Sequence, residues 1–537
     1  MSQASAEPAV APASDSRPGI LGLLLAMAMF VLVVDTSLMN VSISAVVHDL
    51  NTTASGVQSA IAIEALVSAA FILISSKIAD LIGRKLGYAI GLLGYAVGAL
   101  AMVLSQSLLP VIIFWAICGG LGASLLLPSM QALIHGNFEG VAQKKVYALV
   151  GASSAIAAAI GPLIGGFVTT YLSWRVGFLA ELVVIAVVLL GLRLVKDVPY
   201  TGDRRIDLVG AAFSVLAMGG VVLGVLAWED GTGPVLLLLV VGLVGFVSLG
   251  WWLVRRKRSG QPSLIDPDLF QSIHFRLGIS GQTLQQIALG GSMIALPIFL
   301  QMVLEYNALQ AGLSLAPLSL SMFVVAILIG RRSGALRRRP ATIIQLGFAL
   351  GAVGTLTLIP LVPRIDSGLW MAPSLVVLGI GLGLLVSQLN NYTLAPISEE
   401  RISEAAGVNS AGGSFGLSFG LALGGALMLG ALAFQFTNMA NASTVLDDTQ
   451  KQQVATTLDQ NAEVMSNTYL QELLASETPE VQAEVIRINT EARPFGLQVA
   501  LLVPLLSCMF GLAVSTAMTR QKDVQPAANL EEFALGG

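Results

Sequence analysis

Apolar runs of about 20 residues recur along the whole chain, and they constrain its fold more than any other feature. A helix of that length crosses a bilayer with every backbone polar group hydrogen-bonded. Hydrophobic residues make up 55% of the 537 residues and charged residues 11%, which excludes a soluble globular protein. The sequence therefore predicts an all-α polytopic membrane protein with about 14 transmembrane helices. The runs lie near 20–47, 57–79, 86–105, 109–132, 146–171, 176–195, 207–228, 233–254, 276–303, 310–330, 341–362, 369–394, 406–436 and 496–518.

The basic residues predict the orientation of these helices, because Lys and Arg concentrate in the short cytoplasmic loops of membrane proteins. If the N-terminus lies inside, the inward loops and tails hold all 28 basic residues except Arg175, Arg364, Lys451, Arg487 and Arg493. A shift by one span would reverse this bias. We therefore predict a multi-pass protein of the cytoplasmic membrane with both termini in the cytoplasm.

Polar segments flank and interrupt the apolar pattern. Residues 1–17 are rich in Ala, Ser and Pro and lack the basic start of a signal peptide, which predicts a disordered cytoplasmic tail, and residues 519–537 form a second tail. Segment 437–495 is expected outside, and its Thr478-Pro479 pair is a typical helix start. We expect one or two amphipathic helices lying on the outer face, with a plain solvated connector as the alternative.

Several functional classes are disfavoured by composition. The two cysteines, Cys118 and Cys508, fall in apolar runs and the three histidines are scattered, so neither a disulfide framework nor a metal site is expected. The net charge of −4 and the placement of basic residues in short loops argue against a nucleic-acid partner. We recognise no catalytic constellation, and expect no enzyme, no cofactor beyond a coupling proton, and a monomer.

Acidic residues inside the predicted spans are the strongest functional candidates. A carboxylate in the membrane costs roughly 3 kcal/mol or more, so Asp35 and Glu64 are expected to face a wet cavity or a partner. Burial and a like-charged neighbour both favour the protonated form, which suits proton exchange. We predict that both acids face one cavity and bind protons or a cation, the alternative being a purely structural role. Glu181, only about 5 residues into its span, is expected at the wet interface.

Amide side chains gather on the first span and on two spans of the second half. Such groups either hydrogen-bond a substrate or hold helices together. We predict that they line the substrate cavity, with helix packing as the alternative. They are Asn40, then Gln282, Gln285 and Gln286 at the spacing of one helix face, and the cluster of Gln388, Asn390 and Asn391.

Short motifs between and within the spans resemble those of a known family. Residues 76–85 place Asp80 before a Gly83-Arg84-Lys85 turn, which is similar to motif A of the major facilitator superfamily. Residues 330–339 look like a degenerate copy of it. The run Gly161-Pro162-Leu163-Ile164-Gly165-Gly166 resembles motif C, the antiporter motif. Trp174-Arg175 and the segment from Asp35 to Asn40 resemble further signatures of the fourteen-helix drug:proton antiporter branch, which contains multidrug efflux transporters.

The resemblance implies two six-helix bundles, residues 18–200 and 259–518, with an inserted helix pair at 201–258. It also implies that Asp80 contacts a nearby arginine and the positive end of a neighbouring helix. In motif C the glycines would permit close helix approach and Pro162 would bend the helix. One departure is Ala116, which occupies the place of the motif B arginine, so a proton relay through that arginine cannot operate unchanged.

These features predict a proton-coupled secondary transporter that exports lipophilic cations or neutral amphiphiles by alternating access. A cavity with carboxylates and no basic residue favours such cargo over anions. Two alternatives stay open: a lipid or lipid-conjugate transporter without strict proton coupling, and a non-transporting sensor or platform that recruits a partner through segment 437–495.

Overall fold

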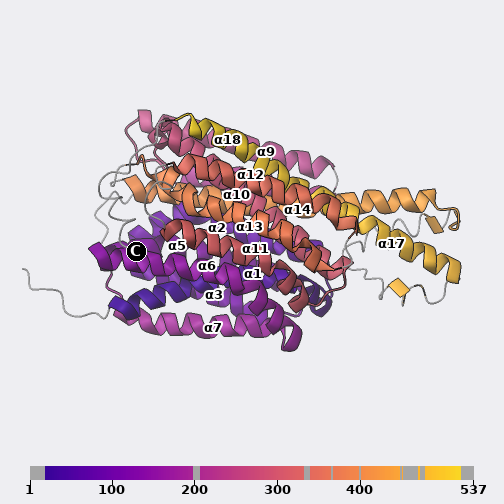
Figure 1. The fold of residues 1–537 in the computed structure, drawn as a ribbon. Helices are drawn as coiled ribbons and strands as arrows, with labels where there is room; N and C mark the ends of the chain where they lie inside the picture. The colour runs from indigo at the N-terminus through magenta and orange to yellow at the C-terminus, as the bar shows by residue number, and fades with distance from the viewer. Residues whose placement is uncertain are drawn as a thin grey trace, which may run out of the picture.

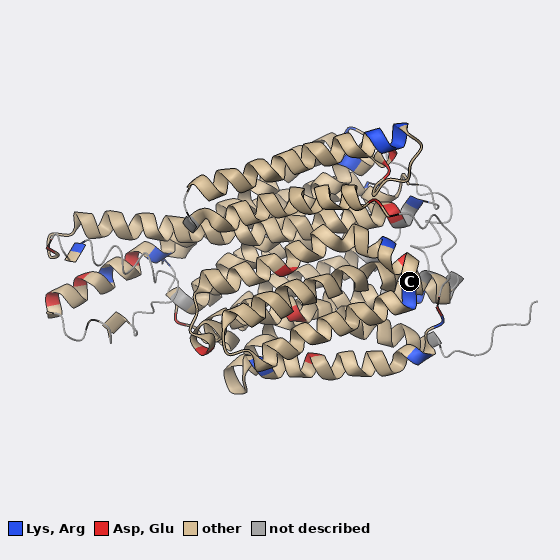
Figure 2. Cartoon of the chain, turned by 180° about the vertical axis from the view of Figure 1, so that it is seen from behind, with Lys and Arg blue, Asp and Glu red and all other residues tan. Residues whose placement is uncertain are grey.

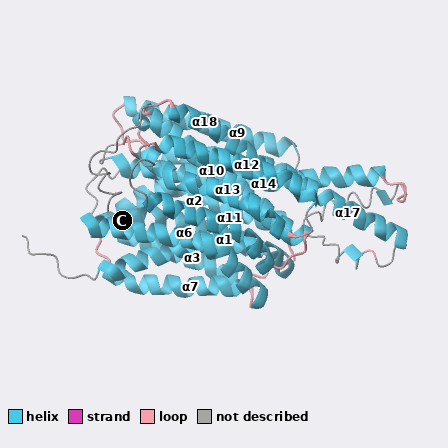
Figure 3. Ribbon diagram, viewed as in Figure 1, coloured by secondary structure: helices cyan, strands magenta, loops and turns pink. Residues whose placement is uncertain are grey.

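The computed structural model describes residues 18–138, 140–197, 206–230, 232–331, 339–364, 367–397, 401–447, 450–451, 470–471, 474 and 478–521. The described residues form helices and loops, without a strand (Figure 3). Fourteen of these helices are long and apolar enough to cross a membrane, which confirms the number predicted from the apolar runs. The degenerate motif A copy falls mostly on residues 332–338, outside the described part of the chain.

The first six spans pack together into one bundle. The fourth of them is interrupted by a π-helical segment, η1, and α1 packs along α6 and α7 while α3 packs along α5, η1 and α7. The elements are α1 (Pro18–Leu50), α2 (Ala54–Ile82), α3 (Arg84–Leu104), α4 (Leu108–Pro110), η1 (Val111–Gly119), α5 (Gly120–Asn137), α6 (Gly140–Tyr171) and α7 (Trp174–Gly191).

The last six spans form a second bundle of similar organisation. Here α10 packs on α14 and α18, and α13 packs on α11 and α12. The elements are α10 (Ile273–Ile298), continued by the π-helical η5 (Phe299–Val303), α11 (Ala308–Arg331), α12 (Pro340–Leu361), α13 (Ala372–Leu394), α14 (Ile402–Ala442), α17 (Pro479–Ala500) and α18 (Leu502–Thr519). The last two are consecutive parts of the fourteenth span.

Two further helices, α8 (Leu208–Leu226) and α9 (Thr232–Arg258), pair with each other, and α8 also packs on α2 and α14. The start of α8 is fixed by the buried Asp207, whose side chain accepts from Gly210 N at 2.9 Å. The same carboxylate accepts from Trp252 Nε1 at 3.0 Å and from Leu264 N at 3.1 Å. This cap therefore ties both inserted helices to the chain that leads into α10.

Both ends of the helical chain lie on one face of the molecule, where α1 begins and α18 ends (Figure 1). We call this the terminal face and the opposite end the far face. Lys and Arg positions gather at the terminal face, whereas the helical interior shows a few acidic positions (Figure 2). The distribution agrees with the bias of basic residues found in the sequence.

The expectation for segment 437–495 is wrong in its described parts. Instead of lying on the outer face, α14 continues to Ala442 and α17 packs along it, so the two helices project together beyond the far face (Figure 1). Polar residues can remain helical there because the two helices shield each other's apolar side. The predicted helix start is confirmed, since Thr478 Oγ1 accepts from Val481 N at 3.4 Å with Pro479 in the first turn.

Candidate functional site

Asp35 lies inside the first bundle near the middle of α1, with 1% of its surface exposed. Trp115 Nε1 donates to its Oδ1 and Oδ2 at 3.2 and 3.1 Å, and the Tyr95 hydroxyl donates to Oδ2. The π-helical turn of η1 carries Trp115, as such turns often do at functional sites. The carboxylate is thus held by two neutral donors rather than by a cation, and it points into the bundle.

Glu64 lies on the buried side of α2, with 9% of its surface exposed. It lies close enough to Asp35 for their charges to interact. The fourth span packs closely on the same part of α2, where a Cβ at Gly120 would come within 2.8 Å of the Glu64 carbonyl oxygen. The structure thus brings together the two acids singled out in the sequence, although both are enclosed by the first bundle rather than lining an open cavity.

The expectation for Glu181 is wrong. Glu181 is buried, with 4% of its surface exposed, and both carboxylate oxygens are inaccessible to solvent. It lies on the same face of α7 as Phe178 and Ile185, the face that packs against α1 and α3. The position of Glu181 near the end of its span did not predict its burial. Burial depends on which face of the helix carries the residue, and Glu181 lies on the packed face.

The two bundles meet directly in the half nearer the far face, along α2–α14 and α6–α11. We call this contact the seam. A Cβ at Gly166 would lie 2.5 Å from Ala308 O, and one at Gly312 would lie 2.3 Å from Pro162 O. Ser418 Oγ donates to Ala62 O at 2.7 Å across the same interface. The seam is therefore closed by backbone contact that only small residues permit.

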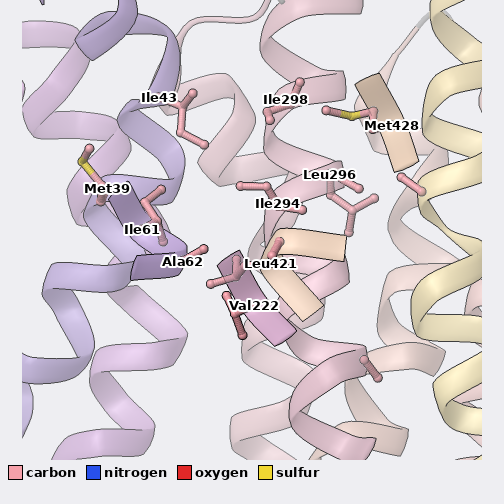
Figure 4. Packing of buried hydrophobic residues seen from close by; sticks show 14 of the residues in the cluster. Met39, Ile43, Ile61, Ala62, Val222, Ile294, Leu296, Ile298, Leu421 and Met428 are labelled. Carbon is pink, nitrogen blue, oxygen red and sulfur yellow. The ribbon is translucent and has the colours of Figure 1, made fainter. Parts of the chain in front are cut away.

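Large apolar side chains also lie at this interface. Met39 and Ile61 of the first bundle lie opposite Ile294 and Leu421 of the second, all of them buried (Figure 4). An apolar plug of this kind excludes water and ions between the buried acids and the far face.

The remaining motif C glycines pack against α1. A Cβ at Gly161 would come within 2.6 Å of Ser37 Cβ, and one at Gly165 would come within 2.9 Å of Leu38 Cα. Motif C therefore lets α6 approach α1 on one side and α11 on the other. This arrangement is the close helix approach implied by the sequence resemblance.

Motif A forms a tight turn at the terminal face. Gly83 has φ +105°, a conformation that favours glycine, and its N–H closes α2 on Ala79 O at 3.0 Å. Asp80 pairs with Arg84 at 2.9 Å, as implied for a nearby arginine. Asp197 lies at the N-terminal, positive end of the α3 dipole, and its Oδ1 accepts from Lys85 N at 3.0 Å.

The predicted amide sites of the second half do not form one cluster. On α10, Gln285 is buried with neither amide atom hydrogen-bonded among the described residues, whereas Gln282 and Gln286 lie against Gly413 of α14. On α13, Gln388 is half-buried, Asn391 is exposed and Asn390 Oδ1 accepts from Asn409 Nδ2 at 3.1 Å. In the first bundle Asn40 is buried and donates to Thr36 O at 2.8 Å.

Sequence reasoning missed Tyr95 and Trp115, which hold Asp35. The sequence shows that each places a hydrogen-bond donor within a predicted apolar span, but it does not show that either donor lies beside Asp35. At the far face, the Trp174-Arg175 pair also holds a carboxylate of α1. Trp174 Nε1 donates to Asp49 Oδ2 at 2.9 Å, and Arg175 pairs with the same carboxylate.

Twelve spans in two helical bundles joined at a seam of small residues, with an inserted pair of spans beside them, define a multi-pass membrane transporter. The model of the Major Facilitator Superfamily matches residues 25–421. The chain belongs to this superfamily, and its number of spans and its efflux relatives agree with the fourteen-helix drug:proton antiporter branch.

Relatives among known proteins carry names connected with drug resistance, export or transport. Puromycin resistance protein pur8 of Streptomyces alboniger is 31% identical over 406 residues, covering 73% of this chain and 78% of the relative. Multidrug export protein EmrB of Escherichia coli K12 is 25% identical over 407 residues, covering 74% and 78%. The probable actinorhodin transporter of Streptomyces coelicolor is 26% identical, covering 75% and 71%.

Solved structures share the fold at low identity. A bacterial homologue of the human lysosomal transporter Spinster aligns with a TM-score of 0.63 at 13% identity, covering 96% of this chain and all of the other. A peptide transporter POT structure aligns with a TM-score of 0.57, also at 13% identity, covering 94% and 96%. These likenesses support the major facilitator fold.

Proposed function

We propose that this transporter is a proton-coupled exporter of lipophilic cations or neutral amphiphiles, working by alternating access across the cytoplasmic membrane. The observation that carries the proposal is the pair of buried, mutually interacting acids, Asp35 and Glu64. The drug and antibiotic names of its relatives support a similar class of cargo.

The charge distribution supports an orientation with the terminal face in the cytoplasm. Basic residues gathered at the terminal face support, by the positive-inside rule, a cytoplasmic terminal face and an outer far face (Figure 2). In the present conformation the seam is closed toward the far face, so cargo would enter from the cytoplasm. Opening of the seam would then expose the acids to outside protons.

The coupling follows from charge. Ionised Asp35 and Glu64 give the first bundle a negative field that attracts a cation at the interface between the bundles. Gln282 and Gln286 on α10, half-buried beside α14, are the proposed hydrogen-bonding partners of the cargo from the second bundle. Proton binding from outside removes the negative charge, which weakens cation binding and releases the cargo. An inward proton gradient then drives export.

The decisive experiment is Asp35→Asn in reconstituted vesicles. We expect this variant to lose transport driven by a pH gradient. Its thermal unfolding and gel-filtration behaviour should match those of the parent protein. Glu491→Gln is the matched control, because the Glu491 side chain is 55% exposed on the projecting helix α17. Unimpaired coupled transport by Asp35→Asn would overturn the assignment of Asp35.

A second candidate cargo, a lipid or lipid conjugate, is favoured by one observation. An apolar hollow of about 530 Å³ opens between the inserted pair and the helices α14 and α17, lined by side chains that include Trp228, Phe434 and Phe495. Acyl chains are the natural occupants of such a hollow in a bilayer. Transport that ignores the pH gradient, together with co-purified lipid, would support this candidate over drug export.

A further inference from the structure

Glu181 is the buried acid that the proposed function leaves unexplained. Its position on α7 is fixed by close contacts with α1: a Cβ at Gly177 would come within 2.1 Å of Leu38 Cδ1, and one at Gly191 within 2.3 Å of Leu24 Cδ1. The two helices therefore run antiparallel in contact. Glu181 lies one turn along α7 from Gly177, and Asp35 lies about one turn along α1 from Leu38. The antiparallel pairing of the two helices therefore places Glu181 at the same depth as Asp35.

The charges that face Glu181 come from few elements. Asp35 of α1 and Tyr95 of α3 both interact electrostatically with it. The helix α6, which also contacts α7, carries no titratable residue between Tyr147 and Tyr171, and within α7 the other charged residue is Arg175 at the far end. No basic group among these neighbours offsets a negative charge on Glu181.

Asp35 and Glu181 differ sharply in their hydrogen bonds. Asp35 accepts from Tyr95 and Trp115, so its negative charge is stabilised by aligned donors. Glu181 has two buried oxygens without a hydrogen-bond partner among the described residues. An ionised carboxylate without donors in an apolar interior is strongly disfavoured, and the nearby charge of Asp35 adds repulsion. A single proton shared between them therefore belongs on Glu181.

We propose that Glu181 is a proton-binding site of the transport cycle, which holds a proton while Asp35 is ionised. When Asp35 gains the proton, the O–H bond on Glu181 breaks and one forms on Asp35, so the pair keeps a single negative charge. A second proton from outside then neutralises the pair. This inference rests on the proposed proton coupling, and it assigns the first bundle one proton site more than Asp35 and Glu64 provide.

The first test is infrared spectroscopy of the purified protein at neutral pH. We expect a carbonyl band of a buried, protonated carboxylic acid that shifts on ¹³C-glutamate labelling. Because Glu64 is also a buried glutamate, the spectrum is recorded in Glu64→Gln protein, where the band should persist; it should disappear when Glu181→Gln is added but not when Glu491→Gln is added. If Glu64→Gln protein lacks a band that shifts with labelled glutamate, or if adding Glu181→Gln retains it, the proposal is wrong. Wild-type protein without any labelled band would also overturn it, even if the variants do not fold.

The second test separates proton binding from a structural role. Glu181→Gln keeps the shape but cannot titrate, whereas Glu181→Asp keeps the acid but loses a methylene. We expect transport driven by a pH gradient to fall on the order of 100-fold in the Gln variant, and to be largely retained in the Asp variant. The reverse order would overturn the inference. Wild-type transport insensitive to the pH gradient would instead refute the proposed function itself.

Discussion

The closed seam makes a quantitative prediction about Gly166. A methyl group there would meet Ala308 O at 2.5 Å and Leu309 Cα at 2.9 Å, well inside van der Waals contact. Both obstacles are backbone atoms at the start of α11, so neither can rotate away. Gly166→Ala must therefore push α6 and α11 apart wherever the seam is closed.

The cost of such overpacking is about 1–3 kcal/mol. It falls only on the conformation in which the seam is closed, so the equilibrium between closed and open seam shifts by about 5- to 150-fold toward the open one. A shift of about 5-fold is already a measurable change in the population of the two conformations. A shift of about 150-fold would invert an equilibrium that favours the closed seam.

The assay is a distance measurement by pulsed electron paramagnetic resonance. Spin labels at Leu172 and Leu313, exposed side chains near the far ends of α6 and α11, report separation of the bundles. We expect a longer distance to dominate in Gly166→Ala. The matched control is Gly151→Ala in the same helix, where an added Cβ meets no atom within 4 Å. A distance distribution in Gly166→Ala equal to that of the control would refute the reasoning.

Two further predictions concern one contact in the membrane interior and one at the terminal face. Trp115→Phe removes the indole donor from Asp35, and we expect it to lower the free energy of unfolding in detergent by about 1–3 kcal/mol, measured against a Trp251→Phe control at an exposed position. At the terminal face, partial burial alone would raise the pKa of Asp266, but bonds from Lys257 and Asp268 N and the charge of Arg401 hold that pKa below its ordinary value of 3.8. A carboxyl with a lowered folded pKa stabilises the fold above its unfolded pKa and loses that effect as pH falls through the folded pKa. We therefore expect Asp266→Asn to lower the melting temperature at pH 7 and to lose this effect as the pH falls through the folded pKa, with a loss that does not depend on pH counting against the ionic explanation.

The sequence predicted the spans well because membrane insertion depends on local hydropathy. The small residues of motif C were also predictable, since close helix approach requires glycine wherever it occurs. The tight turn at Gly83 between α2 and α3 was predictable as well. In each case the physical constraint acts within a few neighbouring residues, and it leaves a local pattern.

The buried acid cluster was only partly predictable. Asp35 and Glu64 were conspicuous as charges in apolar runs, but the depth and face of Glu181 depend on how α7 packs against α1 and α3. The partners Tyr95 and Trp115 come from segments 60 and 80 residues away from Asp35. Such contacts are set by tertiary packing, and one sequence contains no periodicity that reports them.

The projection of α14 beyond the far face has a mechanical consequence. The helix meets α2 at the seam through Ser418 and continues as one element to Ala442, about 36 Å further at 1.5 Å per residue. A rigid rotation of the second bundle about a pivot on the terminal side of the seam would displace the helix tip farther than the seam residues. The tip therefore acts as the long arm of a lever, and a fluorophore attached there would magnify each opening of the seam into a displacement that single-molecule measurements can follow.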